Sequence, residues 1–167
     1  MMKTGLALPL MMAVCTGAAF AGEWQHFFND RFGAAADIPA DYKAGEPPAS
    51  DDGGSFTSPD GETSIIIFGA LATVLDDNFS GYAKSLVSYD RNDGWKITYS
   101  TGKADWFAFS GSKGDRIFYE KVISACKGEV ANHVRLEYPS SRKSEFDPIV
   151  AHVTKSLRSK GGYQCKE

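Results

Sequence analysis

Histidine and cysteine side chains are the groups in this 167-residue sequence that could bind a transition metal. His26, His133 and His152 are scattered along the chain, and no two cysteines lie close enough in sequence to form a zinc-binding pair. A zinc site needs three or four converging ligands, and the Asp90–Gly94 segment lacks the ligand spacing and the distal glutamate of a calcium loop. We therefore predict that the protein has no metal site and no cofactor.

Two short segments could suggest serine-based chemistry. Ser110–Gly114 nearly matches the G-x-S-x-G nucleophile motif, but its first residue is serine and the segment lies between two expected strands. The motif needs a strand-to-helix turn, and the S-x-x-K spacing found here and at Ser100–Lys103 lacks its partner motifs. Neighbouring acids such as Asp51–Asp52 fall in a loop, and no glycine-rich phosphate loop is present. We expect no catalytic residues and no enzymatic activity.

Aromatic side chains are concentrated between residues 95 and 119. Residues along a strand point alternately to opposite faces of a sheet, so half of these rings can fill a core while the other half line a groove. Packing across strands is the common use of such rings, but tyrosine and tryptophan are also the usual anchors of binding interfaces. The side chains that we select as a candidate partner surface are Trp95, Tyr99, Trp106 and Tyr119.

The N-terminal segment has the composition of a secretory signal peptide. Lys3 supplies the positive start, Leu6–Ala19 is an uncharged apolar stretch, and Ala19–Ala21 fits the small-residue cleavage pattern. A membrane anchor is the alternative, but this run is shorter than the ~20 residues that a spanning helix needs, and it contains Pro9. We predict cleavage after residue 21, a periplasmic or secreted location, and no integral membrane segment in the mature protein.

Removal of residues 1–21 also changes the cysteine count. Cys15 leaves with the signal, and because the residue before it is Val14, which is not small, a lipidated cysteine is the weaker alternative. The remaining chain holds only Cys126 and Cys165. An isolated pair outside the cytoplasm usually forms a disulfide, so we predict a bond between them, with two free thiols as the alternative.

Residues 22–167 are modestly acidic, with 17 basic and 21 acidic side chains. Nucleic-acid-binding proteins carry a basic face, and so do proteins that bind acidic membrane surfaces. The charge balance therefore argues against both kinds of partner. The length suits one domain of about 100–150 residues.

Turn and periodicity signals divide this domain into strands and helices. Pro59-Asp60-Gly61 is a turn that joins Ser55–Ser58 and Thr63–Leu71 into a hairpin. Leu75–Ser88, which Asp77 or Asn78 can cap, and Glu145–Leu157 have apolar stripes of helical period. Ala44–Gly54 is expected to be an exposed loop, and Trp24–Asp30 a short helical or extended lead-in. The remaining strands are expected at Arg31–Ile38, Trp95–Ser100, Trp106–Ser110, Arg116–Ala125 and Val130–Tyr138.

This order of elements predicts the fold class. Short glycine-bearing turns between consecutive strands are typical of an antiparallel meander. Runs of strands with separate helices indicate an α+β architecture. We predict a signal peptide over residues 1–21 and a single α+β domain over residues 22–167, with an antiparallel sheet of about six to seven strands and helices packed on it.

Several segments resemble the PsbP-like family. Arg31–Pro39 resembles the sequence with which these domains begin, and Asp115–Glu120 and Tyr138–Leu157 resemble small exported proteobacterial proteins. The similarity extends over residues 24–158, although the tryptophan usual after the first proline is absent and Tyr42 is the nearest aromatic residue. The resemblance implies an antiparallel sheet between helices and a non-catalytic accessory or binding role.

We therefore predict a periplasmic or secreted, non-enzymatic binding or accessory protein, with another envelope protein or a small ligand as its partner. Two alternatives remain open. A small secreted hydrolase of envelope polymers would need His133 or His152 hydrogen-bonded to a serine or an acid in a cleft. An immunity protein against a secreted toxin would be encoded beside that toxin.

Overall fold

The computed structural model describes residues 22–75, 78–162 and 164–165. The predicted signal peptide and Asp77 lie outside these residues. The helices are α1 (Phe79–Asn92) and α2 (Lys143–Ser156). The strands are β1 (Trp24–Phe28), β2 (Ala34–Pro39), β3 (Lys43–Ala44), β4 (Gly53–Thr57), β5 (Ser64–Leu71), β6 (Lys96–Gly102), β7 (Trp106–Lys113), β8 (Arg116–Ala125), β9 (Val130–Pro139) and β10 (Arg158–Ser159).

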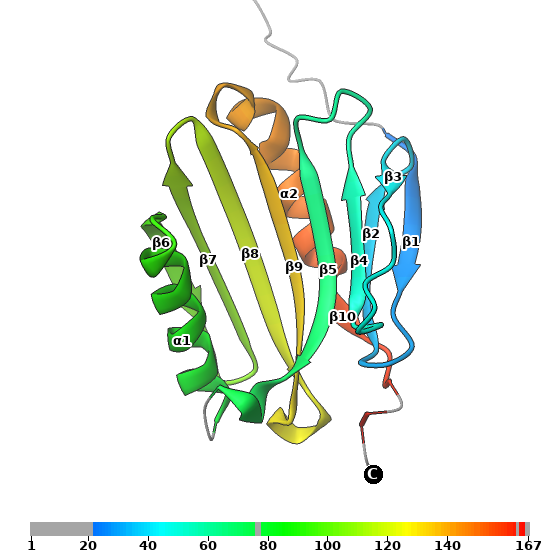
Figure 1. Cartoon of the computed structure of the whole chain (residues 1–167), viewed down its shortest axis with the longest axis vertical. Helices are drawn as coiled ribbons and strands as arrows, with labels where there is room; N and C mark the ends of the chain where they lie inside the picture. The colour runs from blue at the N-terminus through cyan, green and yellow to red at the C-terminus, as the bar shows by residue number, and fades with distance from the viewer. Residues whose placement is uncertain (1–21, 76–77, 163, 166–167) are drawn as a thin grey trace, which may run out of the picture.

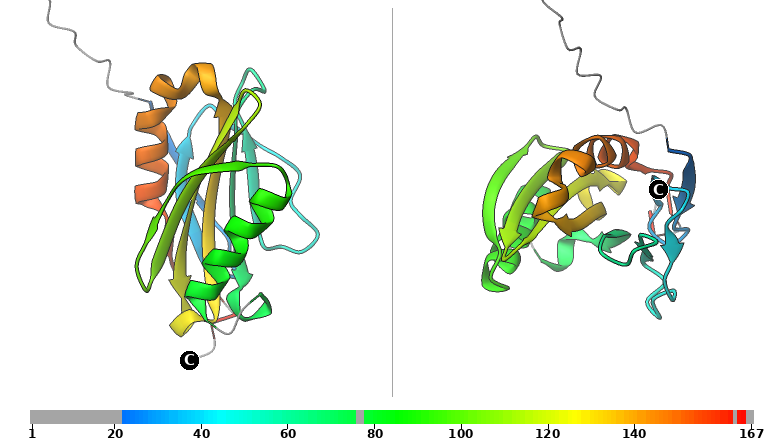
Figure 2. Two further views of the ribbon diagram at one scale, coloured as in Figure 1. Left: turned by 90° about the vertical axis from the view of Figure 1, so that its left-hand side faces the viewer. Right: turned by 90° about the horizontal axis from the view of Figure 1, so that it is seen from above.

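The strands form two antiparallel sheets (Figure 1). The large sheet has seven strands in the order β3-β4-β5-β9-β8-β7-β6, and the small sheet has three in the order β1-β2-β10. Helix α1 covers one face of the large sheet at its β6 end, and α2 lies on the opposite face (Figures 1 and 2). The fold is therefore α+β, and the predicted antiparallel sheet of six to seven strands is confirmed.

Strand alternation divides the buried side chains into two cores, one on each face of the large sheet. On β8, Phe118 and Val122 belong to the core under α1. On β9, Val134 and Leu136 belong to the core that α2 and the small sheet cover. Because β8 and β9 contribute to both cores, the position of a residue in their alternation decides which helix it faces.

The hairpin around Pro59-Asp60-Gly61 is present as β4 and β5, whereas the first predicted helix is displaced along the chain. Residues 72–74 form a 3-10 turn, and α1 begins only after Asn78, whose side-chain oxygen accepts a hydrogen bond from the Gly81 N–H at 3.0 Å. The apolar stripe is real, but the N-cap at Asn78 sets the start of the helix.

The small sheet is the part of the fold that the sequence patterns did not predict. The lead-in at residues 24–30 contains strand β1, which pairs with β2 in the register His26↔Asp37. The two residues of β10 pair with Ala35 and Ala34 of β2, more than 120 positions earlier in the chain. The predicted loop at residues 44–54 is shortened at both ends by β3 and β4.

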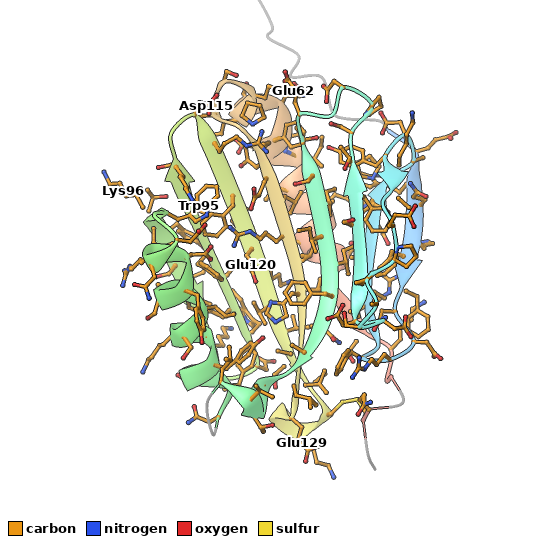
Figure 3. The ribbon with its side chains drawn as sticks, viewed as in Figure 1. Glu62, Trp95, Lys96, Asp115, Glu120 and Glu129 are labelled. Atoms are coloured by element: carbon orange, nitrogen blue, oxygen red, sulfur yellow. A yellow bond between two sulfur atoms is a disulfide. The ribbon has the colours of Figure 1, made fainter. Side chains whose placement is uncertain are left out.

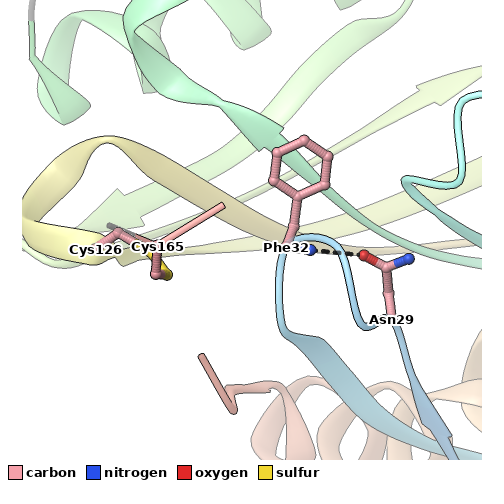
Figure 4. Close-up of a disulfide and its surroundings, with 4 residues drawn as sticks. All are labelled: Asn29, Phe32, Cys126 and Cys165. Atoms are coloured by element: carbon pink, nitrogen blue, oxygen red, sulfur yellow. Dashed lines mark hydrogen bonds between the residues drawn. A yellow bond between two sulfur atoms is a disulfide. The ribbon is translucent and has the colours of Figure 1, made fainter. Parts of the chain in front are cut away.

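A disulfide between Cys126 and Cys165 joins the C-terminal tail to the turn between β8 and β9, as predicted (Figure 4). The two Cα atoms are 5.1 Å apart, and the bond closes a separation of 39 residues. Backbone hydrogen bonds from Lys160 to Gly33 and from Gln164 to Arg31 hold the same tail against the β1–β2 turn. In that turn, Asn29 accepts a hydrogen bond from the Phe32 N–H at 2.9 Å (Figure 4).

Candidate functional site

Three of the four aromatic residues selected from the sequence lie on one face of the large sheet. Tyr99 and Tyr119 both pair with Ser110, one from each neighbouring strand, so they belong to the same cross-strand row. Their rings are stacked, with centroids 6.3 Å apart. Trp106 lies on the same face, because it is four residues from Ser110 along β7.

The two tyrosines line a groove of about 510 Å³ between the β6–β7–β8 end of the sheet and α2. Strand residues form its floor, and the wall contains an ion pair between Lys143 and Asp147 of α2, with Nζ and Oδ1 2.8 Å apart. The side chains available to a ligand are therefore mainly aromatic rings and neutral hydroxyls. The lining residues are Thr98, Tyr99, Ser110, Gly111, Ser112, Ile117, Tyr119, Tyr138, Lys143, Asp147 and Val150.

Trp106 lines a second hollow of about 440 Å³ on the same face, beside Lys121, Ile123 and Ser159. Lys121 donates a hydrogen bond to the Thr154 carbonyl of α2 at 2.8 Å. Burial lowers the pKa of this lysine below its ordinary value. We call the groove and this hollow together the aromatic groove.

Tyr119 and Tyr138 of the aromatic groove are neutral hydrogen-bonding groups at physiological pH. Burial, with the neighbouring Tyr99, raises the pKa of Tyr119, and burial also raises the pKa of Tyr138. Tyr99 remains 47% exposed. These rings offer flat apolar surface with a polar edge, which is the combination that anchors binding interfaces.

Trp95 does not join the other three selected residues. Its side chain is 8% exposed and packs edge-on against Phe118, with ring centroids 4.9 Å apart, on the side of the sheet that carries α1 (Figure 3). A β-bulge between Ile97 and Tyr99 explains the difference. In a regular strand Trp95, Ile97 and Tyr99 would point to the same face of the sheet. The extra residue of the bulge turns Tyr99 to the opposite face.

A chain of buried polar side chains under α1 is the feature that sequence reasoning missed. Tyr82 and His133 Nε2 are 2.8 Å apart, and His133 Nδ1 lies 2.8 Å from Glu120 Oε1. Arg135 continues the chain, with hydrogen bonds of 3.0 Å to Glu120 and to Asp90 of α1. Strand alternation was the available signal, since it places Glu120 between two core residues of β8.

Electrostatics keep Glu120 and Arg135 of this chain ionised. Burial opposes the charge on Glu120, but the hydrogen bonds from His133 and Arg135 outweigh it and lower the pKa of Glu120 below its ordinary value. Burial also opposes the charge on Arg135, whose pKa is nevertheless raised by bonds to Asp90, Glu120 and Glu137. His133 is fully buried and Tyr82 is 2% exposed, so a substrate cannot reach these two side chains. The geometry of this buried chain fixes α1 on the sheet.

A second polar cluster surrounds Asp37 on the small sheet. His26 Nδ1 lies 2.7 Å from one carboxylate oxygen, and His152 Nε2 lies 3.2 Å from the other. Arg158 also contacts Asp37 at 3.3 Å. Burial works against the charge on Asp37, but these three partners lower its pKa below the ordinary value. Trp24 stacks on the His152 ring with centroids 3.7 Å apart, which ties β1 to α2.

The hydrolase alternative can be compared directly with this cluster. His152 is bonded to an acid in a hollow of about 390 Å³ that also contains Ser156. However, the Ser156 hydroxyl donates to the Val153 carbonyl and accepts from the Asp37 N–H, both at 2.8 Å. A serine nucleophile needs its hydroxyl hydrogen-bonded to the base, and Ser156 is not arranged in that way.

Two further properties concern metals and membranes. Among residues 22–75, 78–162 and 164–165, no group of three or more His, Cys, Asp or Glu side chains is arranged to hold a metal ion. None of the helices in this part of the chain combines the length and the apolar character that crossing a membrane requires.

Comparison with known proteins identifies the fold. The cyanobacterial PsbP protein CyanoP from Synechocystis sp. PCC 6803 superposes with a TM-score of 0.61 at 10% identity, covering 89% of this chain and 98% of CyanoP. The Ran-binding protein Mog1p from Saccharomyces cerevisiae superposes with a TM-score of 0.59 at 10% identity, covering 83% and 96%. A Mog1 variant gives 0.63 at 9% identity, covering 86% and 100%.

This chain therefore has the PsbP-like fold that its sequence segments resemble, and Mog1 shares that fold. No family model matches the sequence, and no curated protein matches it either. At about 10% identity the likeness concerns the fold alone.

Proposed function

We propose that this protein works outside the cytoplasm as a non-catalytic binding or accessory protein, with the aromatic groove as its binding surface. The observation that carries this proposal is that Tyr99, Tyr119 and Trp106, on three adjacent strands, line hollows on one face of the large sheet. A protein partner is supported by the fold, because Mog1p, which has the same fold, is a Ran-binding protein.

The proposed location rests on the N-terminal sequence and on the disulfide. A disulfide is maintained in oxidising compartments and is rare in the cytoplasm. Mass spectrometry of the protein from fractionated cells tests the location, and we expect a mature N-terminus at Gly22 with Cys126 and Cys165 oxidised. Recovery of the uncleaved, reduced chain from the cytoplasm would exclude it.

The proposed binding role is tested by crosslinking in the native envelope. We expect the wild-type protein to crosslink to a defined partner and a Tyr99→Ala/Tyr119→Ala variant to lose at least nine-tenths of that product. The matched control is Tyr89→Ala, which removes a 59% exposed tyrosine from α1, away from the aromatic groove. Equal crosslinking by all three proteins would show that the partner binds elsewhere.

The hydrolase alternative makes a different prediction. It requires turnover of an ester or glycoside substrate that depends on His152 and Asp37, a histidine–acid pair that borders a hollow. We expect no turnover by the wild-type protein across a panel of such substrates. An immunity protein would be a narrower case of the binding role, in which the crosslinked partner is a toxin encoded beside it.

A further inference from the structure

Strand β6 is the end strand of the large sheet, and no other strand in the described part of the chain pairs with its outer edge (Figure 2). Six of its seven residues are exposed, and only Ile97 is half-buried. The sequence Lys96–Gly102 is rich in β-branched and aromatic residues, carries one charge and contains no proline. Edge strands of this kind pair readily with another strand unless they are covered or heavily charged.

The hydrogen bonding of β6 shows which backbone groups face outward. Lys103 donates its N–H to the Trp106 carbonyl at 2.8 Å, next to the pair Gly102↔Phe107. In an antiparallel pair the hydrogen-bonded positions alternate. The N–H and C=O groups of Thr101 and Tyr99 therefore point to β7, and those of Ser100 and Gly102 point to the open edge.

Hollows lie on both faces beside this edge. On the α2 side, Thr98 and Tyr99 border the groove of about 510 Å³. On the α1 side, Gly102 borders a hollow of about 350 Å³ that Phe79 and Phe107 also line. Because Tyr99 and Gly102 are three positions apart, a strand paired with β6 would direct side chains into the two hollows in turn. Backbone bonds with alternating side-chain pockets are the basis of recognition by strand addition.

Charge distinguishes the possible occupants of the edge. Lys96 and Lys103 lie exposed at its two ends, Lys96 extends away from the sheet (Figure 3), and neither takes part in a salt bridge within the described residues. Antiparallel pairing of two copies about the midpoint between Tyr99 and Ser100 would set Lys96 of one copy opposite Lys103 of the other, and like charges directly opposed across strands are destabilising. A segment with acidic residues at both ends would instead match the lysines.

We propose that β6 binds an extended segment of a partner protein, with acidic ends and a β-prone centre, by antiparallel strand addition. This inference rests on the proposed function, because it names the ligand of the aromatic groove. The occupant adds a strand beside Ser100 and Gly102 and directs alternate side chains toward Tyr99 and toward Phe107.

Selection from a displayed library of random decapeptides tests this inference. We expect the selected peptides to have Asp or Glu at both ends and β-prone residues between them. Ser100→Pro removes one outward N–H while leaving the hydrogen bonds to β7 intact, so it should weaken the binding of these peptides at least tenfold. Ser100→Ala, which keeps the N–H, should bind the peptides with the affinity of the wild-type protein.

Two further measurements keep the test decisive if Ser100→Pro fails to fold. A selected peptide that is N-methylated at alternate residues should lose at least tenfold in affinity for the wild-type protein, because methylation removes the N–H donors along one edge. Lys96→Glu/Lys103→Glu should weaken the binding of the peptides with acidic ends and leave the far-UV circular dichroism spectrum of the protein unchanged.

Several outcomes would overturn strand addition. The first is failure to select any peptide, and the second is equal affinity of Ser100→Pro and Ser100→Ala for the selected peptides. The third is a wild-type dimer that the Ser100→Pro substitution dissociates. The fourth is binding of glycan oligomers in the groove that the Ser100→Pro variant retains. If envelope crosslinking is lost with Tyr99→Ala/Tyr119→Ala but kept with Ser100→Pro, the proposed binding role stands and strand addition fails. If both variants crosslink normally, the proposed groove fails as well.

Discussion

Glu120 is the residue on which the buried ionic chain depends, because it accepts hydrogen bonds from both His133 and Arg135. Removing one partner of a buried ion pair leaves an uncompensated charge, which costs about 3–5 kcal/mol. We expect Glu120→Gln to lower the free energy of unfolding by about 3 kcal/mol, measured by urea denaturation at pH 7. The control is Glu145→Gln, whose ion pair with Arg142 is exposed and should be worth under about 1 kcal/mol. Equal losses from the two variants would contradict the assigned role.

The pH dependence of the same residue has a definite sign. The folded-state pKa of Glu120 lies below its unfolded value, so its stabilisation is present above the unfolded pKa and disappears as the pH falls through the folded pKa. The stability difference between the wild type and Glu120→Gln should therefore shrink below about pH 4, near the ordinary carboxyl pKa. Unfolding curves at pH 7, 4 and 3 measure it, and a difference that grows on acidification would be inconsistent with this sign.

Single residues were predictable from the sequence where their neighbours in the chain decide their environment. Trp106 and Tyr119 lie on one face, as alternation along β7 and β8 allows. Tyr99 shares that face, and Trp95 does not, because of a bulge that depends on the fit of β6 to β7. The role of Glu120 depends on residues from α1 and β9, which sequence spacing does not bring together.

At the scale of elements, the sequence predicted strands that pair with a neighbour in the chain, and it did not predict pairings between distant segments. Strand β8 has the predicted bounds, and β9 extends one residue beyond the prediction. Both lie in a meander in which each strand pairs with its neighbour in the chain. Strand β10 has two residues, and its partner β2 lies at the other end of the chain, so no periodic pattern could indicate it.

The disulfide has a measurable effect at this scale. Closing a 39-residue loop by Cys126–Cys165 removes conformational entropy from the unfolded chain, worth about 4 kcal/mol. We expect Cys126→Ser/Cys165→Ser to lose stability of that order in urea denaturation. Cys126→Ser alone should lose about as much as the double variant, because either change removes the same bond. A double variant as stable as the wild type would show that the tail contributes nothing.

Substitutions at two glycines should lower the stability of the protein by different amounts, because the two glycines lie in different surroundings. A side chain at Gly69 of β5 would overlap the Phe32 side chain at a close-packed contact, so Gly69→Ala should destabilise by about 2–3 kcal/mol. Gly61 in the hairpin turn has a φ of +76° and open space around it, so Gly61→Ala carries only backbone strain of about 1–2 kcal/mol. Thermal unfolding of both variants gives the order, and the reverse order would contradict the packing of the β1–β2 turn against β5.

At the scale of the whole molecule, the two helices leave one part of the large sheet available. Helix α1 and helix α2 cover opposite faces (Figure 2), and among the described residues no strand pairs with the outer edge of β6. The sequence predicted the α+β class from the order of its elements. It did not predict that β6 is an end strand, because the position of a strand in a sheet depends on pairings among all the strands.

Backbone NMR of the isotope-labelled protein with its crosslinked partner, or with a selected peptide, tests the central claim most directly. We expect chemical-shift changes and amide protection from exchange to concentrate on β6 and the aromatic groove, with Ser100 and Gly102 newly protected. Changes that instead concentrate around Asp37 and His152, with β6 amides exchanging as in the free protein, would contradict it.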